Sequence, residues 1–138
     1  MKKLFVLLFL FLIPVIVLPQ EAEEEHEIDT WLGKCLENNY SDYDMAICFQ
    51  TAEEKWDKDL NVVYRKLIKN MDKKEKSALK KSQREWVKWR DKEFKLLISI
   101  YDSGGTMDGL MISSDRMSIV KARVIDLLKY LAHQEQNN

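Results

Sequence analysis

The sequence is poor in the residues from which most catalytic and metal sites are built. Its 138 residues include two histidines, two cysteines and four glycines. The histidines, His26 and His133, stand near the two ends of the part that follows the first 22 residues. No glycine-rich loop cradles a phosphate, no side chains have metal-ligand spacing, and no Ser or Thr nucleophile stands beside a base. We therefore predict no enzyme activity, no catalytic residue, no metal and no other cofactor.

The chain also lacks an excess of basic residues. It has 22 Lys and Arg against 23 Asp and Glu. Residues 1–20 contain two of the lysines and no acid, so 20 basic and 23 acidic residues follow them, a net charge of −3. Proteins that hold a phosphate backbone do so with a basic excess. We therefore expect no nucleic-acid partner.

Long hydrophobic runs are absent except at the N-terminus, which reads MKKLFVLLFLFLIPVIVLPQ. Two lysines precede a run from Leu4 to Leu18, the pattern of a secretory signal peptide. A bilayer span needs roughly 20 apolar residues. We predict a signal peptide over residues 1–22, export to the periplasm or outside the cell, and no stable membrane span after cleavage. Ala22 suits cleavage but Gln20 does not, which leaves an uncleaved anchor as the alternative; no cysteine ends the run, which argues against a lipoprotein.

Both cysteines, Cys35 and Cys48, lie in the part expected to be exported. An isolated pair in an oxidising compartment predicts one disulfide. Closing a loop of this size stabilises a fold by about 3 kcal/mol in the chain-entropy model. A catalytic thiol, the alternative, would need a histidine nearby. The acidic residues 23–28 predict a solvated tail, in which one histidine among glutamates is a weak metal site.

The remaining residues repeat apolar positions at helical spacing, and no strand-like alternation appears. A short helix is predicted from a cap at Asp29 or Thr30, with an apolar face at Trp31, Leu32, Cys35 and Leu36. A long helix is predicted from a cap at Ser41 to about Met71. Its apolar stripe consists of Met45, Cys48, Phe49, Ala52, Trp56, Leu60, Val63, Tyr64, Leu67 and Met71. A third helix is predicted from about Lys76 to Tyr101. The last helix is predicted from a cap at Ser113 or Ser114 to about Leu131. The pattern predicts an all-α domain over residues 29–133, a small helical bundle built on a long antiparallel hairpin with one disulfide.

Polar residues stand on the facing sides of the two long helices. If the chain turns near positions 72–74, facing positions sum to about 147, which places three pairs opposite one another: Asp57 and Arg90, Asn61 and Trp86, Tyr64 and Gln83. We predict an Asp57–Arg90 ion pair and a polar ladder completed by Asn61 and Gln83, which would fix the register. Arg90→Ala would then cost several kcal/mol, because a buried charge would lose its partner. Trp86 is expected to point inward as well.

These residues also carry a resemblance to a known family. The C-x12-C pair, WDKDLNVVYRKL and LKKSQREWVKWRDKEF are similar to the LprI-like family, named for a lysozyme inhibitor. The family's pattern of a Cys pair, D-x-x-L-N-x-x-Y and Q-R-x-W-x-x-x-R-D-x-x-C covers about Cys35 to Leu128. Its motif residues fall here on Asp57, Leu60, Asn61, Tyr64, Gln83, Arg84, Trp86, Arg90 and Asp91. The last motif cysteine is Phe94 here, so the resemblance implies that the final helix is held by packing alone and frays first.

The resemblance implies an exported bacterial envelope protein that inhibits lysozyme, or another cell-wall hydrolase, by protein–protein binding. The alternative is a structural or adaptor protein of the envelope without this activity. A blocking element would enter the sugar cleft of the enzyme and meet the two carboxylates there. The candidate partner-binding residues are those of the glycine loop, Asp102, Ser103, Gly104, Gly105 and Thr106. The hydroxyls of Ser103 and Thr106 would hydrogen-bond to the enzyme's carboxylates. Alternatively, the glycines only end the long helix and turn the chain. Trp89 is a further candidate contact residue, or an aromatic at the core edge.

Overall fold

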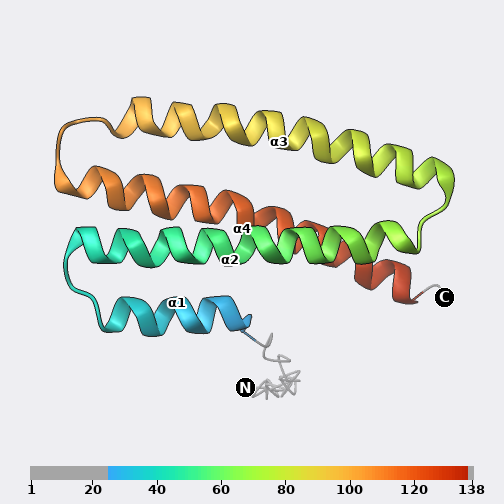
Figure 1. Cartoon of the computed structure of the whole chain (residues 1–138), viewed down its shortest axis with the longest axis horizontal. Helices are drawn as coiled ribbons and strands as arrows, with labels where there is room; N and C mark the ends of the chain where they lie inside the picture. The colour runs from blue at the N-terminus through green and yellow to red at the C-terminus, as the bar shows by residue number, and fades with distance from the viewer. Residues whose placement is uncertain (1–24, 137–138) are drawn as a thin grey trace, which may run out of the picture.

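The computed structural model describes residues 25–136, so the predicted signal peptide lies outside the described residues. Four helices make up this part of the chain: α1 (Glu27–Glu37), α2 (Asp42–Lys69), α3 (Lys73–Tyr101) and α4 (Thr106–Gln136). No strand occurs among the described residues. The all-α class, the antiparallel α2–α3 hairpin and the single disulfide are confirmed (Figure 1).

Two helix starts follow from side-chain caps. At α2, the Ser41 hydroxyl accepts a hydrogen bond from the Asp44 backbone N–H at 3.0 Å, which is the predicted cap. At α3, Asp72 and Glu75 form a reciprocal capping box, which accounts for a start three residues before the predicted Lys76.

The other two helix starts also lie earlier than expected. α1 begins at Glu27, because the His26 ring accepts from the backbone N–H of Ile28 and caps the helix before Asp29. α4 begins at Thr106 rather than after Ser113. The chain turns from α3 into α4 in a short loop, in which Gly104 takes φ 81°, a left-handed conformation that glycine adopts without strain.

In space the helices lie in the order α3, α4, α2, α1 (Figure 1). α2 and α4 pack most closely, and they run parallel because α3 returns the chain to the same end. Two side-chain hydrogen bonds set their register: Gln50 donates to Ser113 at 3.2 Å, and Arg116 donates to Glu53 at 3.0 Å. Each of these hydrogen bonds joins residues that are 63 positions apart in the sequence, so α2 and α4 keep the same register along this stretch.

The core is centred between α2 and α4. The largest fully buried side chains all come from these two helices: Trp56, Leu67, Leu127, Val120, Val124 and Cys48. By contrast, α3 contributes only Leu79 and Leu97 as buried residues. Among the described residues α4 is held by packing without a disulfide, as expected, and it packs along the core while α3 lies at its edge. That α4 frays first stays a prediction.

Candidate functional site

The predicted pairing of the two long helices is present at one point. The Arg90 guanidinium lies 3.7 Å from the Asp57 carboxylate, which confirms the ion pair. Both side chains keep contact with solvent, with 21% and 48% of their surface exposed. Arg90 is also held by its neighbour Asp91 at 2.7 Å. The pair is therefore a half-exposed contact rather than the buried one expected.

The rest of the predicted polar ladder does not form. The Asn61 amide donates to the Asp57 backbone carbonyl one turn earlier, at 2.7 Å. Gln83 accepts from Arg123 of α4 at 3.0 Å rather than bonding to a residue of α2. α3 lies mainly against α4, and Arg123 of α4 bonds the Gln83 side chain that was expected to face α2.

Trp86 is partly buried against the core, as predicted. Its ring has the guanidinium groups of Arg90 and Arg123 at 5.4 and 5.8 Å from the ring centre. Arg116 similarly lies 4.4 Å from the centre of the Phe94 ring. The contacts of Arg123 and Arg116, which belong to α4, hold α3 on the bundle although few residues of α3 are fully buried.

The motif residues line an open groove between α2 and α3 instead of a closed seam. The groove has a volume of about 630 Å³ and is lined by Asp57, Leu60, Asn61, Tyr64, Lys80, Gln83, Arg84, Val87 and Arg90. Most of the motif on which the family resemblance rests therefore lies in one solvent-accessible place.

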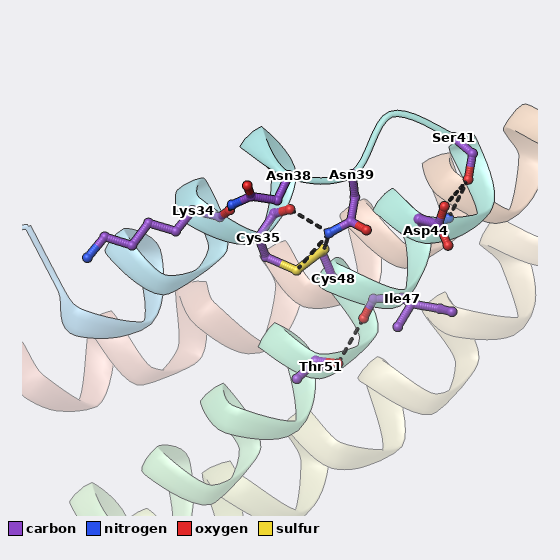
Figure 2. Close-up of a disulfide and its surroundings, with 9 residues drawn as sticks. All are labelled: Lys34, Cys35, Asn38, Asn39, Ser41, Asp44, Ile47, Cys48 and Thr51. Atoms are coloured by element: carbon purple, nitrogen blue, oxygen red, sulfur yellow. Dashed lines mark hydrogen bonds between the residues drawn. A yellow bond between two sulfur atoms is a disulfide. The ribbon is translucent and has the colours of Figure 1, made fainter.

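The predicted disulfide joins Cys35 of α1 to Cys48 of α2 (Figure 2). The Asn39 side-chain amide lies over it and donates to the Cys35 carbonyl at 2.7 Å and to the Cys48 sulfur at 3.6 Å. The bond fixes the corner between α1 and α2 at the end of the bundle where α3 also turns into α4 (Figure 1).

The glycine loop is held by one carboxylate. Asp108 accepts from the backbone N–H groups of Ser103 and Gly105, each at 2.9 Å, and from the Ser103 hydroxyl at 2.9 Å. These hydrogen bonds, above all that from the Ser103 side chain, lower the pKa of Asp108. The Thr106 hydroxyl donates to Asp42 of α2 at 3.2 Å. Both loop hydroxyls are thus engaged within the protein, so the loop offers a fixed shape rather than free hydroxyl groups.

This end of the bundle, which we call the tip, consists of residues 38–54 and 96–115. Neither range contains a Lys, Arg or His, and together they contain seven acids: Asp42, Asp44, Glu53, Glu54, Asp102, Asp108 and Asp115. Large apolar side chains are exposed on the first turns of α2 and α4: Tyr43, Ile47, Met107 and Met111. The tip is therefore acidic and partly apolar.

The apolar tip residues were not among the candidates drawn from the sequence. Tyr43 and Ile47 fall outside the apolar stripe of their helix. Apolar residues outside the stripe are expected to face solvent, and this was the feature of the sequence that could have identified them. What the sequence did not indicate is that α2 and α4 start side by side, which brings their first turns together. Trp89 is 48% exposed, but it lies on α3 about three turns from the loop and is not part of the tip.

The opposite end of the bundle has the reverse charge. Residues 65–84, which we call the basic hairpin, cover the end of α2 and the first turns of α3. They contain two acids, Asp72 and Glu75, and nine basic residues: Arg65, Lys66, Lys69, Lys73, Lys74, Lys76, Lys80, Lys81 and Arg84. Among the described residues, none of the nine forms an ion pair with a carboxylate. The near-neutral total charge conceals this separation.

Within residues 25–136, no group of three or more His, Cys, Asp or Glu side chains is placed to hold a metal ion. No helix in this range has the length and apolar character needed to cross a membrane.

Comparison with known proteins gives one match. A family model described as Lysozyme inhibitor LprI matches residues 35–127, which is most of the described chain. No curated protein and no solved structure matches the chain.

Proposed function

The chain belongs to the LprI lysozyme-inhibitor family, and we propose that it is an exported protein that inhibits lysozyme by binding it through the tip. The family match carries the activity class, since the family is one of inhibitors rather than enzymes. The charge of the tip supports the choice of surface.

Lysozymes are commonly strongly cationic, and opposite charge speeds the encounter of two proteins. The tip ranges contain seven acids and no basic residue, and one of the acids, Glu53, is paired with Arg116 just outside them. The basic hairpin would repel the same partner. Electrostatic steering would therefore bring the tip, rather than the other end, against the enzyme.

The tip covers the mouth of the sugar cleft instead of placing hydroxyls on the catalytic carboxylates. Ser103 and Thr106 already donate to Asp108 and Asp42, and these carboxylates would repel the two of the enzyme at close range. The exposed side chains of Tyr43 and Met107 supply apolar contact area around the acids. Because Asp108 fixes the loop in advance, little conformational entropy is lost on binding.

The direct test is a turbidity assay in which lysozyme lyses a bacterial suspension in the presence of the purified mature protein. Inhibition at micromolar excess, with co-elution of the two proteins, is expected. Unchanged lysis without co-elution would rule out the inhibitor and leave the adaptor protein as the remaining candidate.

A pair of variants assigns the surface. Tyr43→Ala with Met107→Ala removes apolar area from the tip, and Val62→Ala with Tyr130→Ala removes exposed apolar side chains elsewhere. We expect at least tenfold weaker inhibition from the first pair and little change from the second. Equal inhibition by both would place the contact outside the tip.

A further inference from the structure

α3 differs from the other long helices in how little of it faces the core. Only two of its 29 residues are buried, and it lies on the opposite side of the bundle from α1 (Figure 1). The solvent-facing side of α3 is therefore free along the whole length of the molecule, with no other described helix above it.

This side of α3 carries a line of exposed apolar residues. Trp89, Leu96 and Ile100 are spaced i, i+7 and i+11, which places them on one face of a helix. Their exposures are 48%, 48% and 63%, so each projects a large apolar surface into water. Scattered exposed apolar residues are common, but an aligned set on one helix indicates a contact surface.

Lysines border this apolar line. Lys81, Lys88 and Lys92 are also spaced i, i+7 and i+11, and all three are exposed. On a helical projection at ~100° per residue their row lies about 60–100° from the row of Trp89. Over the whole helix, ten Lys and Arg against four acids give a net charge of +6. Lys88 is partly balanced by Glu85 at 2.9 Å, whose pKa it lowers, whereas Lys81 and Lys92 form no ion pair with described carboxylates.

We propose that the outer face of α3, formed by Lys81, Lys88, Lys92, Trp89, Leu96 and Ile100, docks on the surface of a bilayer containing anionic lipid. Basic side chains beside a Trp- and Leu-bearing face are the features of a helix that lies in the headgroup region. The lysine ammonium groups meet lipid phosphates, and the tryptophan ring suits the boundary between headgroups and acyl chains.

The same features disfavour the hydrolase of the proposed function as the occupant of this face, because a cationic partner would be repelled. The inference is therefore independent of the proposed function. Leu96 and Ile100 fall within the residue ranges of the tip, so docking through α3 would cover this part of it. The first turns of α2 and α4 would remain accessible.

The test measures partition of the processed, exported protein onto vesicles of phosphatidylcholine, with and without one-third phosphatidylglycerol. We expect at least tenfold stronger binding to the anionic vesicles in low salt, and loss of this preference in high salt. Equal binding to the two vesicle types would overturn the proposal. Equal binding is also the result expected if a retained apolar N-terminal segment, rather than α3, held the protein on the vesicles.

Charge variants locate the surface. Lys81→Gln with Lys92→Gln removes two charges from the face, and each lysine near an anionic surface contributes about a factor of five to ten, so roughly 30-fold weaker partition is expected. Lys34→Gln with Lys58→Gln makes the same charge change on α1 and α2 and should alter partition by less than about threefold. Equal losses from both pairs would overturn the assignment to α3.

A fluorescence measurement tests the apolar half of the face. Brominated acyl chains should quench tryptophan emission in the wild type, and Trp89→Phe should abolish this quenching while preserving partition. Quenching that persists in Trp89→Phe would contradict the proposed orientation. Binding to soluble polyphosphate without binding to anionic vesicles would identify a polymer rather than a bilayer as the partner, and would also overturn the proposal.

Discussion

The tip and the basic hairpin carry opposite charges, although the whole chain has a net charge of only −1. The tip ranges have seven acids and no basic residue, whereas the basic hairpin has nine basic residues and two acids. The two ends are also held differently. A disulfide and an Asp108-centred loop fix the tip, while a capping box closes the turn of the basic hairpin. A small, nearly neutral bundle can therefore present two surfaces that suit partners of opposite charge.

The largest expected effect concerns the covalent bond at the tip. Replacing Cys35 and Cys48 by alanine should lower the free energy of unfolding by about 3 kcal/mol, because the unfolded chain gains the freedom of the opened loop. Urea unfolding measures the change. At the basic hairpin, Asp72→Ala should cost about 1 kcal/mol, the usual value of a lost helix cap. A smaller loss from the cysteine pair than from Asp72→Ala would contradict the view that the disulfide is the main restraint at either end.

The glycine loop contains two adjacent glycines that should respond differently to substitution. Gly104→Ala should destabilise the protein by about 1 kcal/mol, because φ 81° is unfavourable for any residue with a Cβ. Gly105→Ala meets only ordinary contacts, the nearest being the Ser103 hydroxyl oxygen at 3.6 Å, and should change stability by less than about 0.5 kcal/mol. Equal effects in thermal or urea unfolding would show that the loop is not held in this conformation.

The Asp57–Arg90 ion pair, which lies between the two ends, should contribute less to stability than the sequence pattern predicted. Because both side chains are partly exposed, a double-mutant cycle of Asp57→Asn and Arg90→Gln should give a coupling energy below about 1 kcal/mol. A coupling of several kcal/mol would restore the buried seam that the sequence pattern predicted.

Acid should loosen the tip through Asp108. The pKa of this carboxyl is lowered in the folded protein, chiefly by the Ser103 hydroxyl, so its stabilising contribution is present above the usual carboxyl pKa of about 4. That contribution is lost as the pH falls through the lowered folded value. The difference in unfolding free energy between the wild type and Asp108→Asn should therefore shrink below pH 4. A constant difference across this range would contradict the role of the ionised carboxylate.

Much of the fold was predictable because it depends on local periodicity. The apolar stripe containing Trp56 and Leu67 identified the inner face of α2, and Ser41 identified its start. The Asp57–Arg90 contact was also predictable, since two facing helices of equal pitch have one register. The hydrogen-bond partner of Gln83 was not predictable, because a polar side chain on an inner face has several possible partners. The spacing of residues in the sequence does not show which helix supplies the partner. Here α4, through Arg123, competed successfully with α2.

The candidate site was less predictable than the fold. The glycine loop was identified by composition, but its hydroxyls were expected to be free and are used by Asp108 and Asp42. The acidic tip depends on two segments about 60 positions apart that meet only because α2 and α4 are parallel. Overall composition averages their charge with that of the basic hairpin, so the separation appears only once the helices are placed.

The central claim, that the tip is the surface that meets lysozyme, is tested most directly by association rates of two charge-matched double variants. Asp102→Lys with Met107→Lys adds three positive charges at the tip, and Ser77→Lys with Glu135→Lys adds three at the opposite end. We predict that the first pair slows association with lysozyme at least tenfold at low salt, that the second has little effect, and that high salt removes the difference. Equal slowing by both pairs, or greater slowing by the second, would contradict the claim.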